Sequence, residues 1–264
     1  MTGAPDRTSL QPVRAAASEV VTRHAISFVL PAYNEEANVT RAIDSVFAVA
    51  ERLCSSFEII VVDDGSSDRT SELVTEAAVL HPQVRLVRHA RNRGYGEALR
   101  TGFLHARKDY VFFTDADNQF DMEELTLLLP WADRVDVVAG FRKNRQDPAM
   151  RRLNAWVWNR LVRVLFYVPV RDIDCAFKLF RRTALEDIDI ESVGAMVNTE
   201  IMVKLGRTGK TVVEVGVTHL PRTAGTARGA KLTVIARALV EVSRMYGRLS
   251  ELGPGRAPVP PPRA

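Results

Sequence analysis

Strand-like apolar runs alternate with helical patterns along much of the chain, and this alternation is the strongest constraint on the fold. Runs rich in β-branched and aromatic residues cover 26–30, 57–62 and 110–114, with a shorter run at 84–87. Segments with apolar residues at helical spacing lie between them, including a helix predicted over 94–107. Strands and helices in this order pair in parallel through right-handed crossovers. The sequence therefore predicts an α/β fold with an open, mostly parallel sheet flanked by helices.

Polar clusters follow three of these strands directly, at residues 31–35, 63–68 and 115–119. In open α/β sheets, ligands bind beyond the carboxyl ends of the strands. For a single cluster the alternative is an ordinary turn, because Asp and Asn bond their own backbone. Three clusters at one edge of the sheet favour a binding site over three unrelated turns.

The last cluster offers candidate metal ligands. Asp115 and Asp117 stand one residue apart at the end of a strand, and an extended backbone would point both carboxylates to the same face. Gln119 continues this alternation and adds a neutral oxygen. Hard oxygen ligands suit Mg²⁺ or Mn²⁺, and such a cation can bind a diphosphate. We therefore expect a metal site at Asp115, Asp117 and Gln119.

The second half of the chain continues the pattern. We expect a strand over 135–139, a strand with a polar entry over 172–182, a helix over 197–205 and a strand over 211–217. Asn198 is the expected N-cap of the third of these elements.

One domain with tails accounts for the length of 264 residues. We expect a disordered leader over 1–24, the main domain over 25–222, a loop and an amphipathic helix over 223–250, and a Pro-rich disordered tail over 251–264. The basic amphipathic helix suits an anionic membrane surface or a partner subunit, and the alternative is packing on its own domain.

Charge and cysteine content narrow the class of protein. A net charge of +4 and a pI near 9.3 suit an anionic partner, yet no nucleic-acid-binding motif is present, so nucleic acid is not an expected partner. Cys54 and Cys175 are too few for a disulfide framework, which favours a reducing cytosol. Neither a secretory signal nor an apolar run of membrane-spanning length is recognised.

The polar clusters carry three motifs, in this order: Pro31-Ala32-Tyr33-Asn34-Glu35, Val62-Asp63-Asp64-Gly65-Ser66 and Asp115-Ala116-Asp117. Together they resemble the family 2 glycosyltransferases with the GT-A fold. Within that family they are similar to the dolichol-phosphate and polyprenyl-phosphate sugar synthases of the mannose type. The resemblance covers about residues 26–231.

The resemblance implies roles for individual residues. Nucleotide contacts are implied for Pro31, Tyr33, Glu35, Val62 and Asp64, and metal and diphosphate binding for Asp115, Ala116, Asp117 and Gln119. Phosphate or acceptor contacts are implied for Arg142, Arg222 and Lys231, and acidic site positions for Asp174 and Glu200. The chain departs from the family pattern near its acceptor loop, where the expected lysine position holds Arg228 and Lys231 lies three residues further on.

The implied activity is metal-dependent transfer of a sugar from a nucleoside diphosphate sugar to a polyprenyl or dolichyl phosphate, with inversion at the anomeric carbon. A phosphate acceptor is already anionic and needs no strong base. The lipid acceptor implies a cytoplasmic protein at the inner face of the membrane, brought there by surface docking or by a membrane-embedded partner subunit.

Two alternatives remain open from the sequence. A saccharide or small-molecule hydroxyl acceptor would require a base, and Asp174 and Glu200 are the candidates, with a buried structural role as the alternative for each. A non-catalytic nucleotide-sugar-binding module would keep the loop at Asp64 without turnover. Nucleotidyltransferases are disfavoured, because residues 31–35 lack a glycine-rich loop followed by a basic residue.

Overall fold

The computed structural model describes residues 24–143, 158, 160, 165, 166, 168 and 170–221. The strands are β1 (Ala25–Ala32), β2 (Ser56–Asp63), β3 (Val84–Arg88), β4 (Tyr110–Thr114), β5 (Val137–Arg142), β6 (Phe177–Arg181) and β7 (Val212–Val217). The helices are α1 (Val39–Leu53), α2 (Thr70–Leu80), α3 (Tyr95–His105), α4 (Leu125–Leu128), α6 (Arg182–Glu186) and α7 (Val197–Arg207), with short 3₁₀ helices η1 (Met122–Glu124) and η2 (Leu129–Trp131). The predicted leader, acceptor loop, amphipathic helix and tail lie outside the described residues, except for His24 at the end of the leader.

The strands form one seven-stranded sheet in the order β3-β2-β1-β4-β6-β5-β7. All neighbouring pairs are parallel except those of β6, which runs antiparallel to β4 and β5. The predicted open, mostly parallel sheet is confirmed. The antiparallel strand was not predicted, because its apolar pattern does not encode its direction.

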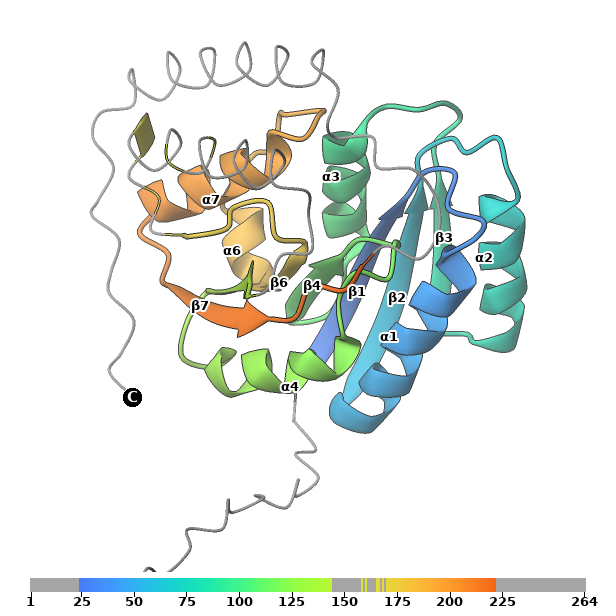
Figure 1. Cartoon of the computed structure of the whole chain (residues 1–264), viewed down its shortest axis with the longest axis horizontal. Coiled ribbons are helices and arrows are strands. Elements are labelled where there is room, and N and C mark those ends of the chain that lie inside the picture. The colour runs from blue at the N-terminus through green and yellow to red at the C-terminus, as the bar shows by residue number, and fades with distance from the viewer. Residues whose placement is uncertain are drawn as a thin grey trace, which may run out of the picture.

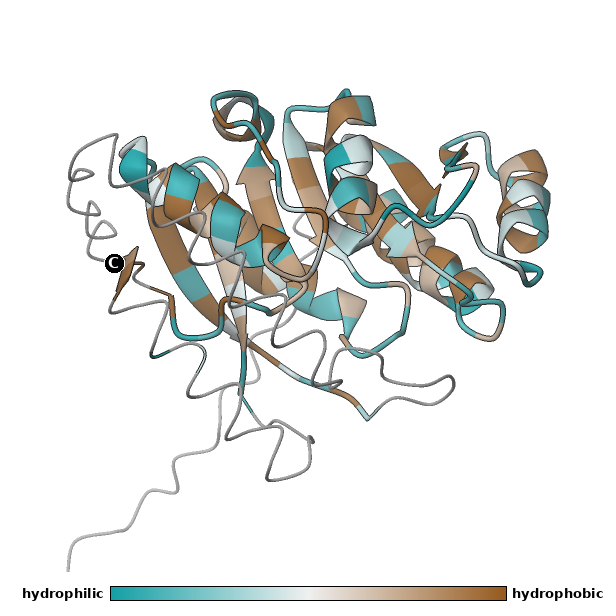
Figure 2. Cartoon of the chain, turned by 90° about the horizontal axis from the view of Figure 1, so that it is seen from above, coloured by the Kyte–Doolittle hydropathy of each residue, from teal (hydrophilic) through white to brown (hydrophobic). Residues whose placement is uncertain are grey.

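Helices cover both faces of the sheet and bury two hydrophobic clusters (Figure 1). Phe28 and Leu30 of β1 pack toward α1, α2 and α4, while Val29 between them packs toward α3 and α7. This alternation follows from the period of two in a strand. Figure 2 shows the strands coloured largely as hydrophobic between the helical layers. A sheet buried on both faces exposes its functional side chains at the strand ends.

One predicted detail is wrong. Asn198 was expected to cap α7, but the N-cap is Met196 and Asn198 is the second residue of the helix. The Asn198 side chain is buried and hydrogen-bonds Tyr95 of α3, so a tertiary contact replaces the local cap. Cys54 and Cys175 are free thiols, as expected. Among the described helices, none is both long and apolar enough to cross a bilayer.

Candidate active site

The three polar clusters meet because β2, β1 and β4 are neighbours in the sheet. Pro31 of β1 pairs with Val62 of β2, and Val29 pairs with Phe113 of β4. Just beyond the paired residues, the Asp64 backbone N–H donates to the Ala32 carbonyl at 2.9 Å. Parallel pairing therefore brings the first, second and fourth strand ends to one edge.

The first two loops are linked by hydrogen bonds around Asn34. Its backbone N–H donates to Ser66 Oγ at 2.8 Å, and its side-chain Oδ1 accepts from the Ser67 backbone at 2.9 Å. Asn34 has a positive φ of 52°, a conformation that Asn tolerates better than most residues. The neighbouring Glu35 N–H donates to Thr70 Oγ1 at 2.9 Å. These bonds fix the backbone that carries Tyr33 and Glu35, a role for Asn34 that the sequence did not predict.

Asp64 has contacts that the sequence did not predict. Its buried carboxylate lies 2.7 Å from His89 Nδ1 and accepts from the backbone N–H groups of Arg93 and Gly94, both at 2.8 Å. The next residue, Gly65, has a φ of 73° and comes so close to the loop after β3 that a Cβ would lie 2.4 Å from the Arg91 backbone. Asp64 thus anchors that loop at the edge of the sheet, and its nucleotide contact stays a prediction.

The segment with Asp115 and Asp117 is a turn, so the extended backbone assumed from the sequence is wrong. β4 ends at Thr114, and Asn118 takes a left-handed φ of 58°. The Asn118 side chain donates to the Asn38 carbonyl at 3.0 Å, which ties the turn to the start of α1. Asp117 is buried, and one of its oxygens accepts from the Gln119 backbone at 3.2 Å.

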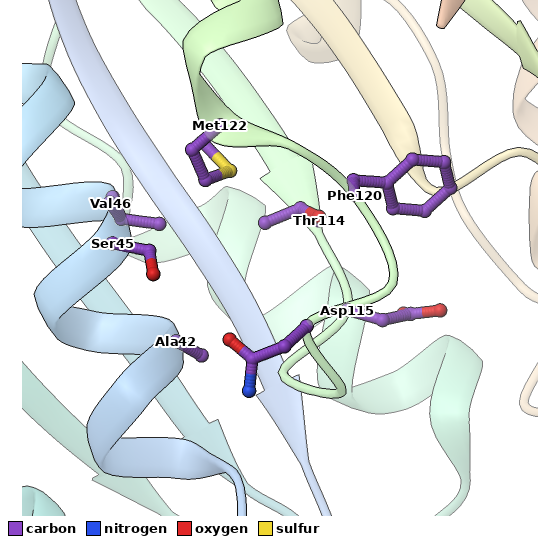
Figure 3. Close-up of a pocket in the computed structure, with 8 residues that line it drawn as sticks. Ala42, Ser45, Val46, Thr114, Asp115, Phe120 and Met122 are labelled. Atoms are coloured by element: carbon purple, nitrogen blue, oxygen red, sulfur yellow. The ribbon is translucent and has the colours of Figure 1, made fainter. Parts of the chain in front are cut away.

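Asp115 and Asp117 nevertheless influence each other. Burial, together with the negative charge of Asp117, raises the pKa of Asp115 from the ordinary 3.8 to about 7. A hydrogen bond from Tyr95 and the positive charges of Lys178 and Arg142 act in the opposite direction. In Figure 3 the Asp115 side chain points away from the α1 residues that line the pocket behind it. The turn therefore presents a repelling carboxylate pair that a cation would relieve.

These residues fit a divalent cation completed by substrate oxygens. The described residues contain no cluster of three His, Cys, Asp or Glu side chains that would hold a metal alone. Mg²⁺ is commonly bound by one or two carboxylates together with substrate phosphates and water. Asp115 and Asp117 can provide the two carboxylates. Gln119 donates through Nε2 to the Leu220 carbonyl at 3.2 Å, so its Oε1 is the amide atom left as an oxygen ligand.

Arg142 is held in a buried ion pair. Its Nε and Nη2 each donate to an Asp172 carboxylate oxygen at 2.6 Å, and both side chains are about nine-tenths buried. The hydrogen bonds and charge of Asp172 outweigh burial and raise the pKa of Arg142, so the guanidinium stays charged. The sequence pattern indicates only a polar strand entry at Asp172. Arg142 is thus oriented by Asp172 near Asp115, and its phosphate contact stays a prediction.

A buried lysine supports the loop before β6. Lys178 is 1% exposed, and its ammonium donates to the carbonyls of Ile173, at 3.0 Å, and of Cys175. This loop carries Asp174, which is partly buried and whose charge acts on Arg142. Asp174 therefore lies close enough for its charge to act on Arg142.

Glu200 holds a loop. Its carboxylate accepts from the backbone N–H groups of Glu191, at 3.0 and 3.1 Å, and of Ser192, at 2.7 Å. Lys204 lies 2.8 Å from the same carboxylate. These contacts favour the structural alternative for Glu200, and its role as a base stays a prediction.

The predicted acceptor contacts Arg222 and Lys231 lie outside the described residues. The chain just before them is described: the Leu220 N–H donates to the Gln119 carbonyl at 2.8 Å, and Phe120 and His219 form an antiparallel bridge. The segment that leads to Arg222 therefore leaves from beside the Asp115–Asp117 turn.

Comparison with known proteins assigns the family. The sequence model described as "Glycosyl transferase family 2" matches residues 27–189. The chain belongs to glycosyl transferase family 2. It is 34% identical over 218 residues to an undecaprenyl-phosphate 4-deoxy-4-formamido-L-arabinose transferase of Pectobacterium carotovorum subsp. carotovorum (strain PC1), covering 80% of this chain and 64% of that protein.

A second protein of similar sequence is a dolichyl-phosphate beta-glucosyltransferase of Trichomonas vaginalis (strain ATCC PRA-98 / G3), 35% identical over 185 residues, which cover 63% of this chain and 53% of that protein. The chain thus spans less than two thirds of the length of these two relatives. Among solved structures, glucosyl-3-phosphoglycerate synthase from Mycobacterium tuberculosis, in complex with Mn²⁺, UDP and glucosyl-3-phosphoglycerate, is similar with a TM-score of 0.66 and 21% identity, over 85% of this chain and 80% of that chain. This likeness confirms the expected GT-A fold.

Proposed function

We propose that this family 2 chain is a metal-dependent, inverting enzyme that transfers a sugar from a nucleoside diphosphate sugar to a polyprenyl or dolichyl phosphate. One observation carries the proposal: the Asp115–Asp117 turn follows β4 and Arg142 ends β5, at the same carboxyl edge of the sheet, where the charge of Arg142 acts on Asp115. Carboxylates for a metal and a cation for a phosphate are what such a transfer needs. Relatives named as lipid-phosphate sugar transferases support the choice of acceptor.

For the donor, we assign the nucleoside to the first two loops, through Pro31, Tyr33, Glu35, Val62 and Asp64. The hydrogen bonds that fix these loops support a pre-formed site.

The diphosphate is assigned to the third loop, with Asp115, Ala116, Asp117 and Gln119 holding Mg²⁺ or Mn²⁺. A bound cation would stabilise the negative charge that develops on the leaving diphosphate. The Mn²⁺ and UDP in a solved structure of the same fold support this choice.

For the acceptor, Arg142, Arg222 and Lys231 are proposed to offset the charge of the lipid phosphate, which attacks without a strong base. Arg142 suits this task because Asp172 holds its guanidinium charged and oriented. Asp174 or Glu200 would serve as a base only with a hydroxyl acceptor. The Glu200 carboxylate accepts hydrogen bonds from the backbone of Glu191 and Ser192. These bonds occupy the oxygens that a base would use, which supports the phosphate acceptor.

A lipid acceptor places the site of action at the cytoplasmic face of a membrane. We propose that the domain over 25–222 carries the chemistry and that the basic segment over 223–250 docks on anionic lipid or on a membrane-embedded partner subunit. The net charge of +4 supports docking on an anionic surface.

The acceptor class is tested by incubating the purified chain with a panel of nucleotide sugars and Mn²⁺, offering either a polyprenyl phosphate or a set of saccharide hydroxyls. We expect product only with the lipid phosphate. Transfer to a saccharide and none to any lipid phosphate would reject the proposed acceptor. Donor binding without transfer to either class would favour a non-catalytic nucleotide-sugar-binding module.

A further inference from the structure

Tyr95 is joined to the Asp115–Asp117 turn by a hydrogen bond that no local sequence pattern predicts. Tyr95 is the first residue of α3, and its hydroxyl donates to Asp115 Oδ1 at 2.8 Å. Its ring packs against the hydrophobic cluster on the α3 and α7 face of the sheet. Because its ring packs against this cluster and its hydroxyl binds a carboxylate, Tyr95 restricts the rotation of the Asp115 side chain.

A second hydrogen bond holds the same hydroxyl from α7. Asn198 is buried and hydrogen-bonds the Tyr95 hydroxyl. The single proton of that hydroxyl goes to Asp115, so the Asn198 amide is the donor in this bond. Asn198 Oδ1 has no hydrogen-bond partner within the described part of the chain, an arrangement that costs free energy in a buried place. The amide is therefore oriented by Tyr95 and is not satisfied on its other side.

The backbone on both sides of Tyr95 is fixed as well. Gly94 has a φ of 102°, and the Gly96 N–H donates to the Val193 carbonyl at 2.9 Å. A Cβ on Gly94 would lie 2.3 Å from the Val193 carbonyl oxygen, and one on Gly96 would lie 2.0 Å from that of Ser192. Glycine on each side of Tyr95 thus allows the start of α3 to pack against the loop at Ser192 and Val193, which fixes the position of the Tyr95 backbone.

We propose that Tyr95 is a positioning residue for metal binding, which holds Asp115 through Oδ1 and leaves Oδ2 for the cation. No described residue donates a hydrogen bond to Oδ2, so that oxygen is available. Partners that hydrogen-bond ligating carboxylates fix the direction of the ligand, and their loss typically weakens metal binding without abolishing it. This inference rests on the proposed function, because it requires that Asp115 binds the metal.

The test measures the affinity of the full chain for Mn²⁺, with free Mn²⁺ quantified by electron paramagnetic resonance. Tyr95→Phe removes only the hydroxyl and should weaken Mn²⁺ binding by about tenfold. The half-saturating Mn²⁺ concentration for sugar transfer should rise by a similar factor, while the rate at saturating Mn²⁺ changes by less than about twofold. If Tyr95 had only a structural role, Tyr95→Phe would not raise the half-saturating Mn²⁺ concentration while leaving the rate at saturating Mn²⁺ nearly unchanged.

Tyr110→Phe is the matched control. The Tyr110 hydroxyl shares its one proton between the Ala132 carbonyl, at 3.2 Å, and Asp133 Oδ1, at 3.0 Å, at the opposite end of β4 from Asp115. Its loss should leave Mn²⁺ affinity unchanged.

Asp115→Ala separates the two proposals. If Tyr95→Phe binds Mn²⁺ as tightly as the wild type while Asp115→Ala binds it weakly, the positioning role is overturned and the metal site stands. If Asp115→Ala also binds Mn²⁺ like the wild type, the metal site itself is wrong and both proposals fall.

Discussion

At the scale of single residues, the Asp115–Asp117 pair lowers the free energy of unfolding of the protein when no cation is bound. Asp115 binds a proton more tightly in the folded than in the unfolded state, since its pKa rises from 3.8 to about 7. Between these values the folded state holds more protons than the unfolded state, so stability falls as pH rises through this window. The penalty is present in full above about pH 7 and disappears at acid pH.

Asp115→Asn should therefore stabilise the protein when a chelator is present. The amide keeps an acceptor for Tyr95 and removes the charge repelled by Asp117. We expect a gain of the order of 1 kcal/mol at pH 8, or about 2–4 °C in Tm, and no gain near pH 4. Calorimetry at both pH values measures it.

The control is Asp133→Asn. Hydrogen bonds from His24 and Tyr110 hold the pKa of Asp133 below its usual value, so neutralising this residue should give no stabilisation. A lower Tm for Asp115→Asn than for the wild type at pH 8 would contradict the repulsion argument.

The Arg142–Asp172 pair should be the most costly ion pair of the site to break. Asp172→Ala leaves the Arg142 guanidinium buried without its carboxylate, and loss of one partner of a buried pair typically costs about 3–5 kcal/mol. Chemical denaturation should show a loss in this range. Glu123→Ala is the control, because it breaks an exposed pair with Arg52 that is worth about 1 kcal/mol or less. Equal losses for the two variants would show that Arg142 does not depend on Asp172.

At the scale of elements, the close approach of α3 to the loop before α7 is a steric requirement. Alanine within a helix is usually more stable than glycine by about 1 kcal/mol. Gly96→Ala should do the opposite and lower stability by about 1–3 kcal/mol, since its Cβ meets the Ser192 carbonyl. Gly206→Ala in α7 is the matched variant, because a Cβ there meets nothing within 4 Å, and it should stabilise the protein. Thermal denaturation compares the two, and a stabilising Gly96→Ala would contradict the packing described here.

The sequence predicted most of the elements but few of the contacts between them. Period-two and helical patterns predicted the first four strands and the helices α3 and α7, because burial of one or both faces of an element gives its sequence a periodic apolar pattern. The direction of β6 and the turn after Thr114 depend on tertiary packing and on one left-handed residue, Asn118. The contacts of Tyr95 with Asp115 and Asn198 join residues distant in sequence, and no local pattern encodes them. The close approach of the backbone on either side of Tyr95 was not predicted, although glycine at 94 and 96 permits it.

At the scale of the whole molecule, one edge of a buried sheet collects the nucleotide loops, the carboxylate pair and the cationic side chain of Arg142. The covered faces leave the strand ends as the place where side chains can meet a ligand. The chain shares its fold with the solved synthase and is similar in sequence to the two named transferases. The chemistry proposed for this chain depends on Asp115 and Asp117 acting through a cation.

The most direct test of this claim is the rate of sugar transfer to polyprenyl phosphate, measured with Mn²⁺, after chelation, and after Mn²⁺ is restored. We predict that chelation abolishes transfer, that added Mn²⁺ restores it, and that Asp115→Ala combined with Asp117→Ala lowers the rate by at least about a hundredfold at any Mn²⁺ concentration. Transfer that continues undiminished after chelation, or in the double variant, would contradict the account.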